Sequence, residues 1–358
     1  MYIVLMAGGI GTRFWPRSRA NMPKQLLNIF GNKSMLRMTY ERIKKLTSDD
    51  KIIIITSMEL SQQVKEHIPE LPEANIIAEP FGRNTAPCIG LASAIINKRA
   101  NKNEVMVVLP ADHLIENDED FRDTVGIAAD YVRENNCLMT IGIAPAYPET
   151  GYGYIQQAEK IQTIHNKNIF KVKTFAEKPN LETAQRFIAS GDFFWNSGMF
   201  IWNVGTIMHS FDEYQHDLMH GISEIEKYLD TPRMNEAIYD LYSKIKSISI
   251  DYGIMEYAKD VHVIQADFKW NDIGSWEAVF NIAQKDQNKN AVTAKDYISI
   301  NSKNNYLFSE KKMVAAIGIK DIVLVDTDDA ILICKKDQSQ MVKELVEEIK
   351  KTDLKNYL

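Results

Sequence analysis

The sequence predicts an α/β fold with a mainly parallel sheet and a small β region near its C-terminal end. Apolar runs of the length of single strands recur in the first half of the chain, and segments with helical spacing separate them, at residues 3–7, 52–56, 105–109 and 138–143. Such alternation is typical of βαβ units on a parallel sheet. After about residue 287 the pattern changes to short segments rich in Val, Ile, Asn and Asp, which favour short strands separated by polar turns.

The middle of the chain is predicted to be a helical insertion that returns to the same sheet. Residues 204–258 have helical spacing, with turn signals at Gly221 and Pro232. An apolar run at residues 261–266 follows, as expected for one more strand.

A final amphipathic helix is predicted at residues 338–351, where apolar side chains share one face and charges the other. We therefore expect a large domain over residues 1–286 and a small β domain over residues 287–358 that ends in this helix.

The composition excludes several classes of function. With 358 residues, of which 45% are hydrophobic and 25% charged, the chain is long enough for more than one packed unit. Its formal charge of −6 provides no basic field, so we expect no nucleic-acid partner. No stretch approaches the roughly 20 apolar residues that cross a bilayer, so we expect neither membrane insertion nor export.

The cysteines indicate a reducing compartment. Cys88, Cys137 and Cys334 are odd in number, far apart and outside any CxxC pattern. We interpret them as reduced thiols of a cytoplasmic protein rather than as disulfides or zinc ligands.

A glycine-rich loop follows the first predicted strand. Gly8, Gly9 and Gly11 let the backbone approach a phosphate closely with its N–H groups turned inward. The loop is not a Walker A motif, because no Gly-Lys-Ser/Thr ends it. It fits Gly-x-Gly-x-x-Gly poorly, because Phe14 stands where the last glycine should be.

Two cations accompany this loop. Arg13 follows it directly, and Lys24 lies eleven residues further on in Pro23-Lys24-Gln25. Guanidinium and ammonium groups neutralise charge on a transferring phosphoryl group and on leaving pyrophosphate. The loop alone therefore predicts a phosphate cradle.

Further motifs follow in a recognisable order. They are Glu79-Pro80-Phe81-Gly82-Arg83-Asn84-Thr85-Ala86-Pro87, Phe175-Ala176-Glu177-Lys178-Pro179, Trp195-Asn196-Ser197-Gly198-Met199-Phe200 and Trp270-Asn271-Asp272-Ile273-Gly274-Ser275-Trp276. With the glycine loop, they make nearly the whole chain resemble the sugar-nucleotide pyrophosphorylases. The variant Phe14-Trp15-Pro16-Arg17-Ser18-Arg19 resembles the branch that transfers a guanylyl group to mannose 1-phosphate, whereas the glucose-specific enzymes usually carry Leu-x-Pro-Leu-Thr there.

The resemblance implies a Rossmann-like nucleotidyltransferase sheet over residues 1–286 and a short β-helix-like domain after it. It implies GTP and mannose 1-phosphate as substrates, Mg²⁺ as cofactor, and a homodimer to which the β domain contributes. Longer, bifunctional relatives carry a fused isomerase domain beyond the point where this chain ends, so we expect a single activity.

The metal is expected between two strand ends. Magnesium prefers one or two carboxylates plus waters and substrate oxygens. Asp112 and Asp272 each follow an apolar run, and the resemblance assigns Mg²⁺ to them. Outside the family, Asp112 is equally well read as a helix cap or turn residue. His113 is expected to be structural or to support the metal ligands, because an ionised sugar phosphate needs no general base.

The nucleotide is expected on the glycine loop and on the loop at residues 79–87. Asn84 or Thr85 is available as the N-cap of the apolar helix that follows. Guanine offers N–H donors, so either the Glu79 carboxylate or a carbonyl such as that of Pro80 is expected to accept from it. The full set of predicted nucleotide-binding residues is Ala7, Gly8, Gly9, Gly11, Thr12, Glu79, Pro80, Gly82, Asn84 and Thr85.

The sugar phosphate is expected on three further segments. Gly153 opens a strand where its backbone can touch a hydroxyl, and Asn196 is a second candidate. The resemblance places Glu177 on sugar hydroxyls and Lys178 on the sugar phosphate. Because Pro179 follows, we expect Lys178 to be extended, with its side chain opposite that of Glu177 unless the loop turns.

The mechanism expected is direct in-line displacement with Arg13, Lys24 and Lys178 as catalytic cations. A heptose or another manno-configured sugar phosphate is an alternative substrate. A catalytically silent nucleotide sensor is a second alternative, although such paralogues would be expected to lose Arg13, Lys24 or an aspartate. A third is a binding module centred on the β region, which would bind ligand without releasing pyrophosphate.

Overall fold

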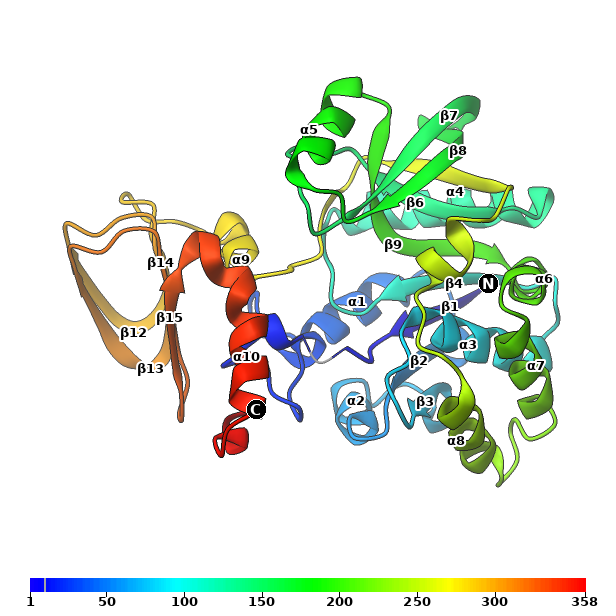
Figure 1. Ribbon diagram of the computed structural model, residues 1–358, viewed down its shortest axis with the longest axis horizontal. Helices are drawn as coiled ribbons and strands as arrows, with labels where there is room; N and C mark the ends of the chain where they lie inside the picture. The colour runs from blue at the N-terminus through cyan, green and yellow to red at the C-terminus, as the bar shows by residue number, and fades with distance from the viewer. Residues whose placement is uncertain (10) are drawn as a thin grey trace. The chain divides into compact units, whose positions relative to one another are not determined.

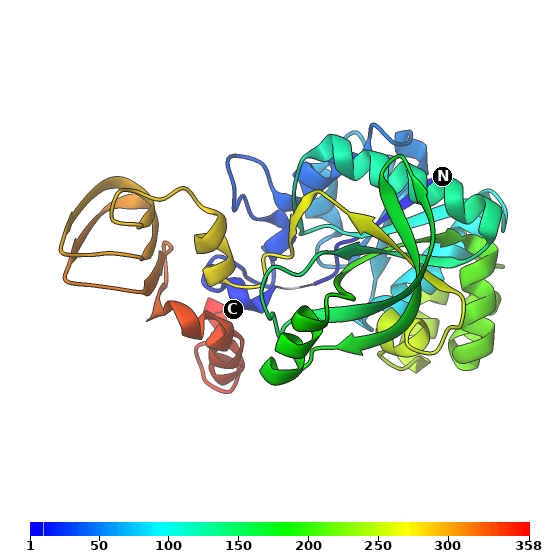
Figure 2. The same ribbon diagram turned by 90° about the horizontal axis from the view of Figure 1, so that it is seen from above.

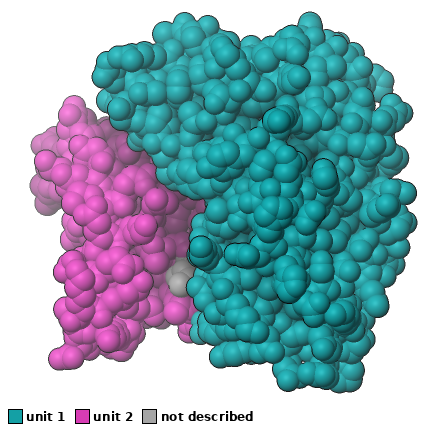
Figure 3. All heavy atoms as spheres, turned by 45° about the vertical axis from the view of Figure 1, so that its right-hand side comes forward, with its two compact units in different colours: residues 1–8, 38–111, 115–270 teal, residues 9–37, 112–114, 271–358 magenta. Residues whose placement is uncertain are grey.

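The structure is a computed structural model that describes residues 1–9 and 11–358. The chain divides into two compact units, which Figure 3 colours separately. Unit 1 comprises residues 1–8, 38–111 and 115–270, and unit 2 comprises residues 9–37, 112–114 and 271–358. Each unit therefore combines segments that are far apart in the sequence.

Unit 1 is built on a nine-stranded sheet, counted over the described residues, with the order β3-β2-β1-β4-β9-β6-β10-β8-β7. Its strands are β1 (Tyr2–Met6), β2 (Ile52–Ser57), β3 (Ile76–Glu79), β4 (Val105–Pro110), β6 (Leu138–Ile143), β7 (Gly153–Ile164), β8 (Lys167–Glu177), β9 (Phe193–Asn203) and β10 (Val261–Ala266). β1 pairs in parallel with β2 and β4, and β6 pairs in parallel with β10. β9 runs antiparallel between β4 and β6. The predicted mainly parallel sheet is confirmed.

The helices of the first 270 residues surround this sheet (Figures 1 and 2). They are α1 (Met35–Ile43), α2 (Ser61–His67), α3 (Thr85–Arg99), α4 (Asp118–Asn135), α5 (Leu181–Ser190), α6 (Val204–Tyr214), α7 (His216–Ile225) and α8 (Met234–Lys244). Two short strands, β5 (Leu114–Glu116) and β11 (Lys269–Asn271), form a separate ribbon. None of the helices in the described part of the chain combines the length and apolar composition that crossing a bilayer needs.

The main core of unit 1 lies between the sheet and the helical insertion. α3 is buried along its whole middle, because side chains of β1, β2 and β4 cover one side of it and α6, α7 and α8 the other. This explains why its sequence is apolar all round rather than amphipathic. The predicted insertion and the return of its last strand to the sheet are both confirmed, since β10 pairs with β6.

One turn predicted within the insertion was wrong. Gly221 lies inside α7 rather than between helices. A methyl group there would overlap the side chain of Leu241 on α8, so the glycine serves close helix packing. Pro232 does lie in the connection between α7 and α8.

Unit 2 contains the small β region. Its strands and helices are β12 (Ala291–Ile300), β13 (Tyr306–Ile317), β14 (Ile322–Asp326), β15 (Ile331–Lys335), α9 (Trp276–Ile282) and α10 (Val342–Lys350). β12, β13 and β14 pair in parallel, and β15 closes the sheet antiparallel to β14. The side chains of buried Asn290 and Asn305 are hydrogen-bonded, with Asn305 Nδ2 donating to Asn290 Oδ1 at 2.9 Å.

A second core joins this β region to the beginning of the chain within unit 2. Phe14, Trp15 and Leu27 pack in one cluster with Trp276 and with apolar side chains of β13, β14 and α10. The Phe14 and Trp276 rings lie 5.0 Å apart, and Trp276 Nε1 donates to the Trp15 carbonyl at 3.1 Å. Phe14, which breaks the dinucleotide-binding glycine pattern, is therefore a core residue here.

Candidate active site

In unit 2, the end of the glycine loop lies against the predicted lysine. Gly11 has a positive φ of 64° and precedes the short turn Thr12–Phe14. A Cβ atom on Gly11 would come 2.5 Å from Lys24 Cβ and 3.2 Å from the Lys24 backbone nitrogen. Only glycine suits both this conformation and this approach. The sequence therefore needs Gly11 to bring the two motifs together.

Lys24 connects the two predicted metal ligands, which also belong to unit 2. Its ammonium is buried, lies 2.9 Å from Asp112 Oδ2 and donates a hydrogen bond to the backbone carbonyl of Asp272. Asp112 and Asp272, which are distant from each other in the sequence, thus both contact the ammonium group of Lys24. The Asp272 carboxylate lies over Gly274, where a Cβ atom would come 3.0 Å from Oδ2.

The electrostatics keep Asp112 ionised. Burial by itself raises the pKa of this carboxyl group, but the charges of Lys24 and His113 and the Lys24 hydrogen bond outweigh it and hold the pKa below its ordinary value. An ionised carboxylate is what a hard cation such as Mg²⁺ requires.

The remaining predicted residues of unit 2 flank this group along the chain. Gly9 and Arg13 are exposed, and Thr12 is partly exposed. Within the described residues, no group of three or more His, Cys, Asp or Glu side chains is arranged to hold a metal ion. A metal at Asp112 and Asp272 would therefore complete its shell with waters and substrate oxygens, which fits Mg²⁺ better than zinc.

In unit 1, Glu79 lies beneath the first residues of the glycine loop. It ends β3, it is 7% exposed, and its Oε2 lies 3.2 Å from the place of a Cβ atom on Gly8. Tyr242 of α8 donates its hydroxyl to Glu79 Oε1 at 2.7 Å. Burial raises the pKa of Glu79 to about 7, and the Tyr242 hydrogen bond opposes this rise. Ala7 is buried beside it, with its nitrogen bonded to the Ile55 carbonyl.

The loop at residues 80–85 is fixed by the helical insertion of the same unit. Asn84 is the N-cap of α3, as one of the two predicted alternatives had it, and its Oδ1 accepts from the Thr85 nitrogen at 2.8 Å. Thr85 Oγ1 accepts instead from the Ile250 nitrogen at 2.8 Å. Pro80 is partly exposed and Gly82 exposed. The side chains of Asn84 and Thr85 thus both accept hydrogen bonds from backbone nitrogens.

The three residues predicted to bind sugar converge in unit 1. Gly153 and Glu177 face each other as partners in the β7–β8 ladder. A methyl group on Gly153 would overlap the Glu177 carboxylate and come 3.3 Å from Asn196 Cβ. The glycine therefore makes room for the Glu177 carboxylate beside the Asn196 amide, and both are groups that bind sugar hydroxyls.

Lys178 does not have the predicted extended conformation. Its φ is 48°, its nitrogen bonds to the Tyr152 carbonyl at 3.2 Å, and its ammonium contacts the carboxylate of Glu177. Pro179 disfavours the right-handed helical region at Lys178 but leaves the left-handed one open. The chain therefore turns sharply after β8, and both side chains lie on one side.

Two polar residues at this site were missed by sequence reasoning. Tyr242 contacts Glu79, and Asp251 accepts from Asn196 Nδ2 at 2.7 Å. Both lie in the helical insertion, more than fifty positions from the residues that they contact. No local motif marks them, so only spatial proximity identifies them.

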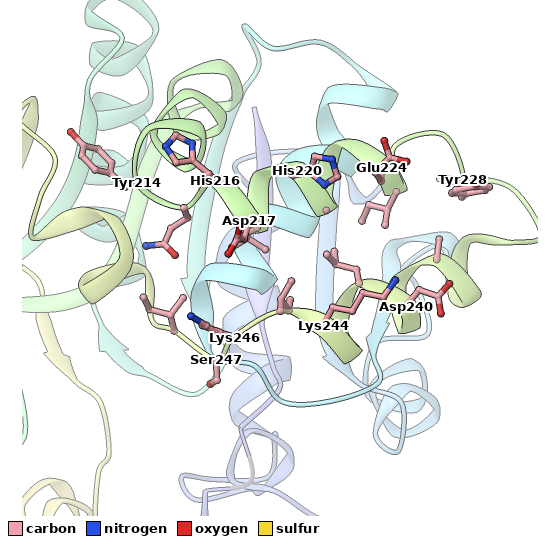
Figure 4. Close-up of a pocket in the computed structure, with 18 residues that line it drawn as sticks. Tyr214, His216, Asp217, His220, Glu224, Tyr228, Asp240, Lys244, Lys246 and Ser247 are labelled. Atoms are coloured by element: carbon pink, nitrogen blue, oxygen red, sulfur yellow. The ribbon is translucent and has the colours of Figure 1, made fainter.

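A cavity of about 820 Å³ lies between α7 and α8 (Figure 4). Tyr214, His220 and Lys244 are among the side chains that line it, and the residues predicted from the sequence are not. The cavity therefore does not belong to the site described above.

The chain is similar to known proteins over nearly its whole length. Residues 2–289 match the family described as nucleotidyl transferase, and residues 295–349 match the MannoseP isomerase/GMP-like beta-helix domain. A mannose-1-phosphate guanylyltransferase of Escherichia coli is 36% identical over 354 residues, which cover 97% of this chain and 75% of that protein.

Two further relatives cover nearly the whole chain. A mannose-1-phosphate guanylyltransferase of Salmonella montevideo is 40% identical over 355 residues, covering 97% of this chain and 73% of that protein. A crystal structure described as a mannose-1-phosphate geranyltransferase from Thermus thermophilus has a TM-score of 0.87 at 28% identity, covering 98% of this chain and 99% of that one.

Proposed function

The chain belongs to the nucleotidyl transferase family, and we propose that it joins GTP and α-D-mannose 1-phosphate to give GDP-mannose and pyrophosphate. The matched family covers more than half of the chain, and relatives that carry this activity in their names match nearly all of it. The C-terminal region matches the β-helix domain of the same group.

The single observation that carries the proposal is the convergence of Lys24, Asp112 and Asp272. Nucleotidyl transfer needs cations around the reacting phosphates and carboxylates that hold a divalent metal. Lys24 supplies an ammonium that touches both aspartates, one through its carboxylate and one through its backbone.

The reaction we propose is a direct displacement without a covalent enzyme intermediate. An oxygen of the mannose 1-phosphate attacks the α-phosphorus of GTP, the new P–O bond forms, and the bond to the pyrophosphate oxygen breaks. The backbone amides of the glycine loop and Arg13 would hold the triphosphate, and Lys24 and Lys178 would screen the two phosphates from each other. Catalysis then comes mostly from positioning and charge stabilisation.

The residues present fit a magnesium ion. Asp112 and Asp272 would hold it, because Asp112 is kept ionised and the described residues contain no cluster of three or more His, Cys, Asp or Glu side chains that could hold a metal elsewhere. When bound, such an ion neutralises charge on phosphate oxygens and fixes their geometry.

The base and sugar are assigned to groups of unit 1. Either the Glu79 carboxylate, whose Oε1 is held by Tyr242, or the Pro80 carbonyl would accept from the N–H donors of guanine. Ala7, Gly8, Gly82, Asn84 and Thr85 would line the nucleotide through their backbone. Gly153, Glu177 and Asn196 would contact sugar hydroxyls, since the three lie together and two of them carry polar side chains.

A substrate panel tests the proposal. Pyrophosphate release would be measured with GTP, ATP, UTP and dTTP, each combined with mannose 1-phosphate, glucose 1-phosphate and a manno-configured heptose 1-phosphate. We expect the highest kcat/KM for GTP with mannose 1-phosphate. A higher kcat/KM with the heptose or with another nucleotide would replace the assigned substrate, and binding without pyrophosphate release would reject the enzyme.

We also propose that the β region mediates a homodimer. Four neighbouring apolar side chains of β12 and β13 are more than half exposed, namely Ile298, Ile300, Met313 and Ile317. Ile300 and Ile317 are paired in the β12–β13 ladder, so these residues form a continuous apolar surface, as expected for an interface. Light scattering of wild type and of Ile317→Asp tests this. We expect a dimer that the substitution converts to monomer, and a monomeric wild type contradicts it.

A further inference from the structure

Asp251 occupies a rigid and unusual piece of backbone in unit 1. It begins a π-type turn, Asp251–Met255, a geometry that is rare and frequent at functional sites. The preceding Ile250 is buried and its nitrogen bonds to Thr85 Oγ1. Gln215 Nε2 donates to the Gly253 carbonyl at 3.0 Å. The position of the Asp251 carboxylate is therefore fixed from two sides.

This carboxylate determines the orientation of the Asn196 amide. Asn196 Nδ2 donates to Asp251 Oδ1 at 2.7 Å, and Asn196 Oδ1 accepts from the Gly198 nitrogen at 3.1 Å. The amide oxygen is thus held by β9 and the amide nitrogen by the π-type turn. The nitrogen carries two hydrogens, so the one that Asp251 does not accept points away from Asp251.

The charged groups around Asp251 come from two elements. Glu177 and Lys178, at the end of β8, act on Asp251 directly, and Glu256, which follows the π-type turn, interacts with Glu177. Burial raises the pKa of Asp251 to about 6, and the charge of Glu177 adds to the rise, whereas the Asn196 hydrogen bond and Lys178 oppose it. The ionised form of Asp251 accepts the stronger hydrogen bond from Asn196.

We infer that Asp251 is a positioning residue of the sugar subsite, which acts by fixing the Asn196 carboxamide so that its second N–H meets a sugar hydroxyl. The inference deepens the proposed function and rests on it, because it assigns Asn196 to the sugar. It adds an aspartate from the helical insertion to a site otherwise built from sheet residues. The geometry that carries it is the pair of opposed hydrogen bonds at the two ends of one amide.

Steady-state kinetics test the inference with three variants. Asp251→Ala removes the acceptor and is expected to raise the KM for mannose 1-phosphate about tenfold, as expected for a lost hydrogen bond to a charged group. The KM for GTP is expected to stay within about twofold, since Asp251 does not contact the predicted nucleotide residues. Asp251→Asn keeps an acceptor oxygen but loses the charge, so its KM for mannose 1-phosphate is expected to lie between those of wild type and Asp251→Ala, near that of wild type with protonated Asp251. Asp240→Asn, an exposed acid on α8, is the matched control.

The pH dependence of kcat/KM distinguishes a positioning role of Asp251 from a purely structural one. Wild type is expected to lose kcat/KM for mannose 1-phosphate as the pH falls through about 6, where Asp251 becomes protonated. Asp251→Asn should lose the part of this acid limb that comes from Asp251 and keep the part that comes from the substrate phosphate, whose second pKa is about 6. An unchanged sugar KM in Asp251→Ala, or the same acid limb in Asp251→Asn, would overturn the inference. Should Asp251→Ala fail to fold, the Asn variant still decides through its pH profile.

A measurement without turnover keeps this test apart from that of the proposed function. The side-chain amide resonance of Asn196, assigned by its loss in Asn196→Asp, is expected to shift with a midpoint near pH 6 in wild type and to stay constant in Asp251→Asn. A resonance that does not titrate in wild type contradicts the inference even if the enzyme is active. Failure of wild type to release pyrophosphate counts instead against the proposed function, and the amide titration still decides on Asp251.

Discussion

Glu79 and Asp251 in unit 1 and Asp112 in unit 2 are partly or fully buried carboxylates whose pKa values shift in opposite directions. In unit 1, burial raises the pKa of Glu79 to about 7 and that of Asp251 to about 6, and their hydrogen-bond donors are a tyrosine hydroxyl and an amide. In unit 2, burial also acts on Asp112, but the ammonium of Lys24 reverses its effect and the pKa falls. Burial thus acts to raise the pKa of all three acids, and a neighbouring cation reverses the net direction at Asp112.

This difference matches the tasks proposed for the two units. Acids held by neutral donors suit the recognition of hydroxyl groups and base edges, where hydrogen bonds carry specificity. An acid that is kept ionised beside a cation suits a site where phosphates and a divalent ion meet. The following substitutions test this difference between the two units.

Asp272→Ala should have the largest effect. Lys24 contacts the backbone carbonyl of Asp272, so that bond survives the substitution and only the carboxylate is lost. We expect turnover to fall at least about 10³-fold, as befits removal of a metal ligand, while the fold is kept. Pyrophosphate release at increasing Mg²⁺, with circular dichroism and Asp353→Ala as control, measures this. Normal activity in Asp272→Ala would sink the metal assignment.

Lys24→Gln should raise the pKa of Asp112, as burial raises the pKa values of Glu79 and Asp251 in unit 1. Without the ammonium, burial is no longer offset and the pKa of Asp112 rises. We expect a loss of about 10²-fold in kcat/KM and, beyond the acid limb assigned to Asp251, an additional loss at acid pH as Asp112 becomes protonated. The pH–rate profile of this variant, beside that of the exposed Lys295→Gln, checks both. An acid side of the profile identical to that of wild type would show that Lys24 does not control Asp112.

Gly153→Ala should disturb only the sugar side of unit 1. The added methyl group would overlap the Glu177 carboxylate and press on Asn196. We expect the KM for mannose 1-phosphate to rise about tenfold to a hundredfold with an unchanged KM for GTP, because displaced groups lose hydrogen bonds to the sugar. Gly126→Ala on α4, where a Cβ atom meets nothing within 4 Å, is the control. Equal changes in both KM values would argue against a separate sugar subsite.

Tyr242→Phe should have the smallest effect, and one that depends on pH. The folded-state pKa of Glu79, about 7, lies above its ordinary value of 4.5, so the stability that this group contributes is complete below pH 4.5 and is lost as the pH rises through about 7. Without the Tyr242 hydroxyl, the pKa of Glu79 rises further.

We therefore expect Tyr242→Phe to lower the free energy of unfolding by about 1 kcal/mol more at pH 8 than at pH 5. Denaturant unfolding at the two pH values measures this, with Tyr239→Phe on the exposed side of α8 as control. A penalty that is the same at both pH values would mean that Tyr242 does not act through ionised Glu79.

Prediction from the sequence was most successful where the signal is local. β2 and β6 were predicted from largely apolar runs at residues 52–56 and 138–143, and the cap of α3, predicted at Asn84 or Thr85, is Asn84. The grouping of Gly153, Glu177 and Asn196 came from resemblance to a family, and the structure does bring these residues together. The left-handed turn at Lys178 was not foreseen, because Pro179 restricts but does not determine its conformation.

By itself, the sequence predicted most of the elements, the glycines of the candidate phosphate loop and the family to which the chain belongs. Only the tertiary structure decided that β9 runs antiparallel between β4 and β6, that residues 9–37 pack with the C-terminal β region, and that Tyr242 and Asp251 hold Glu79 and Asn196. The physical reason is the range of the forces involved. Strand and cap preferences depend on neighbours in the chain, whereas the charge of a buried acid depends on whichever donor or cation the fold brings beside it.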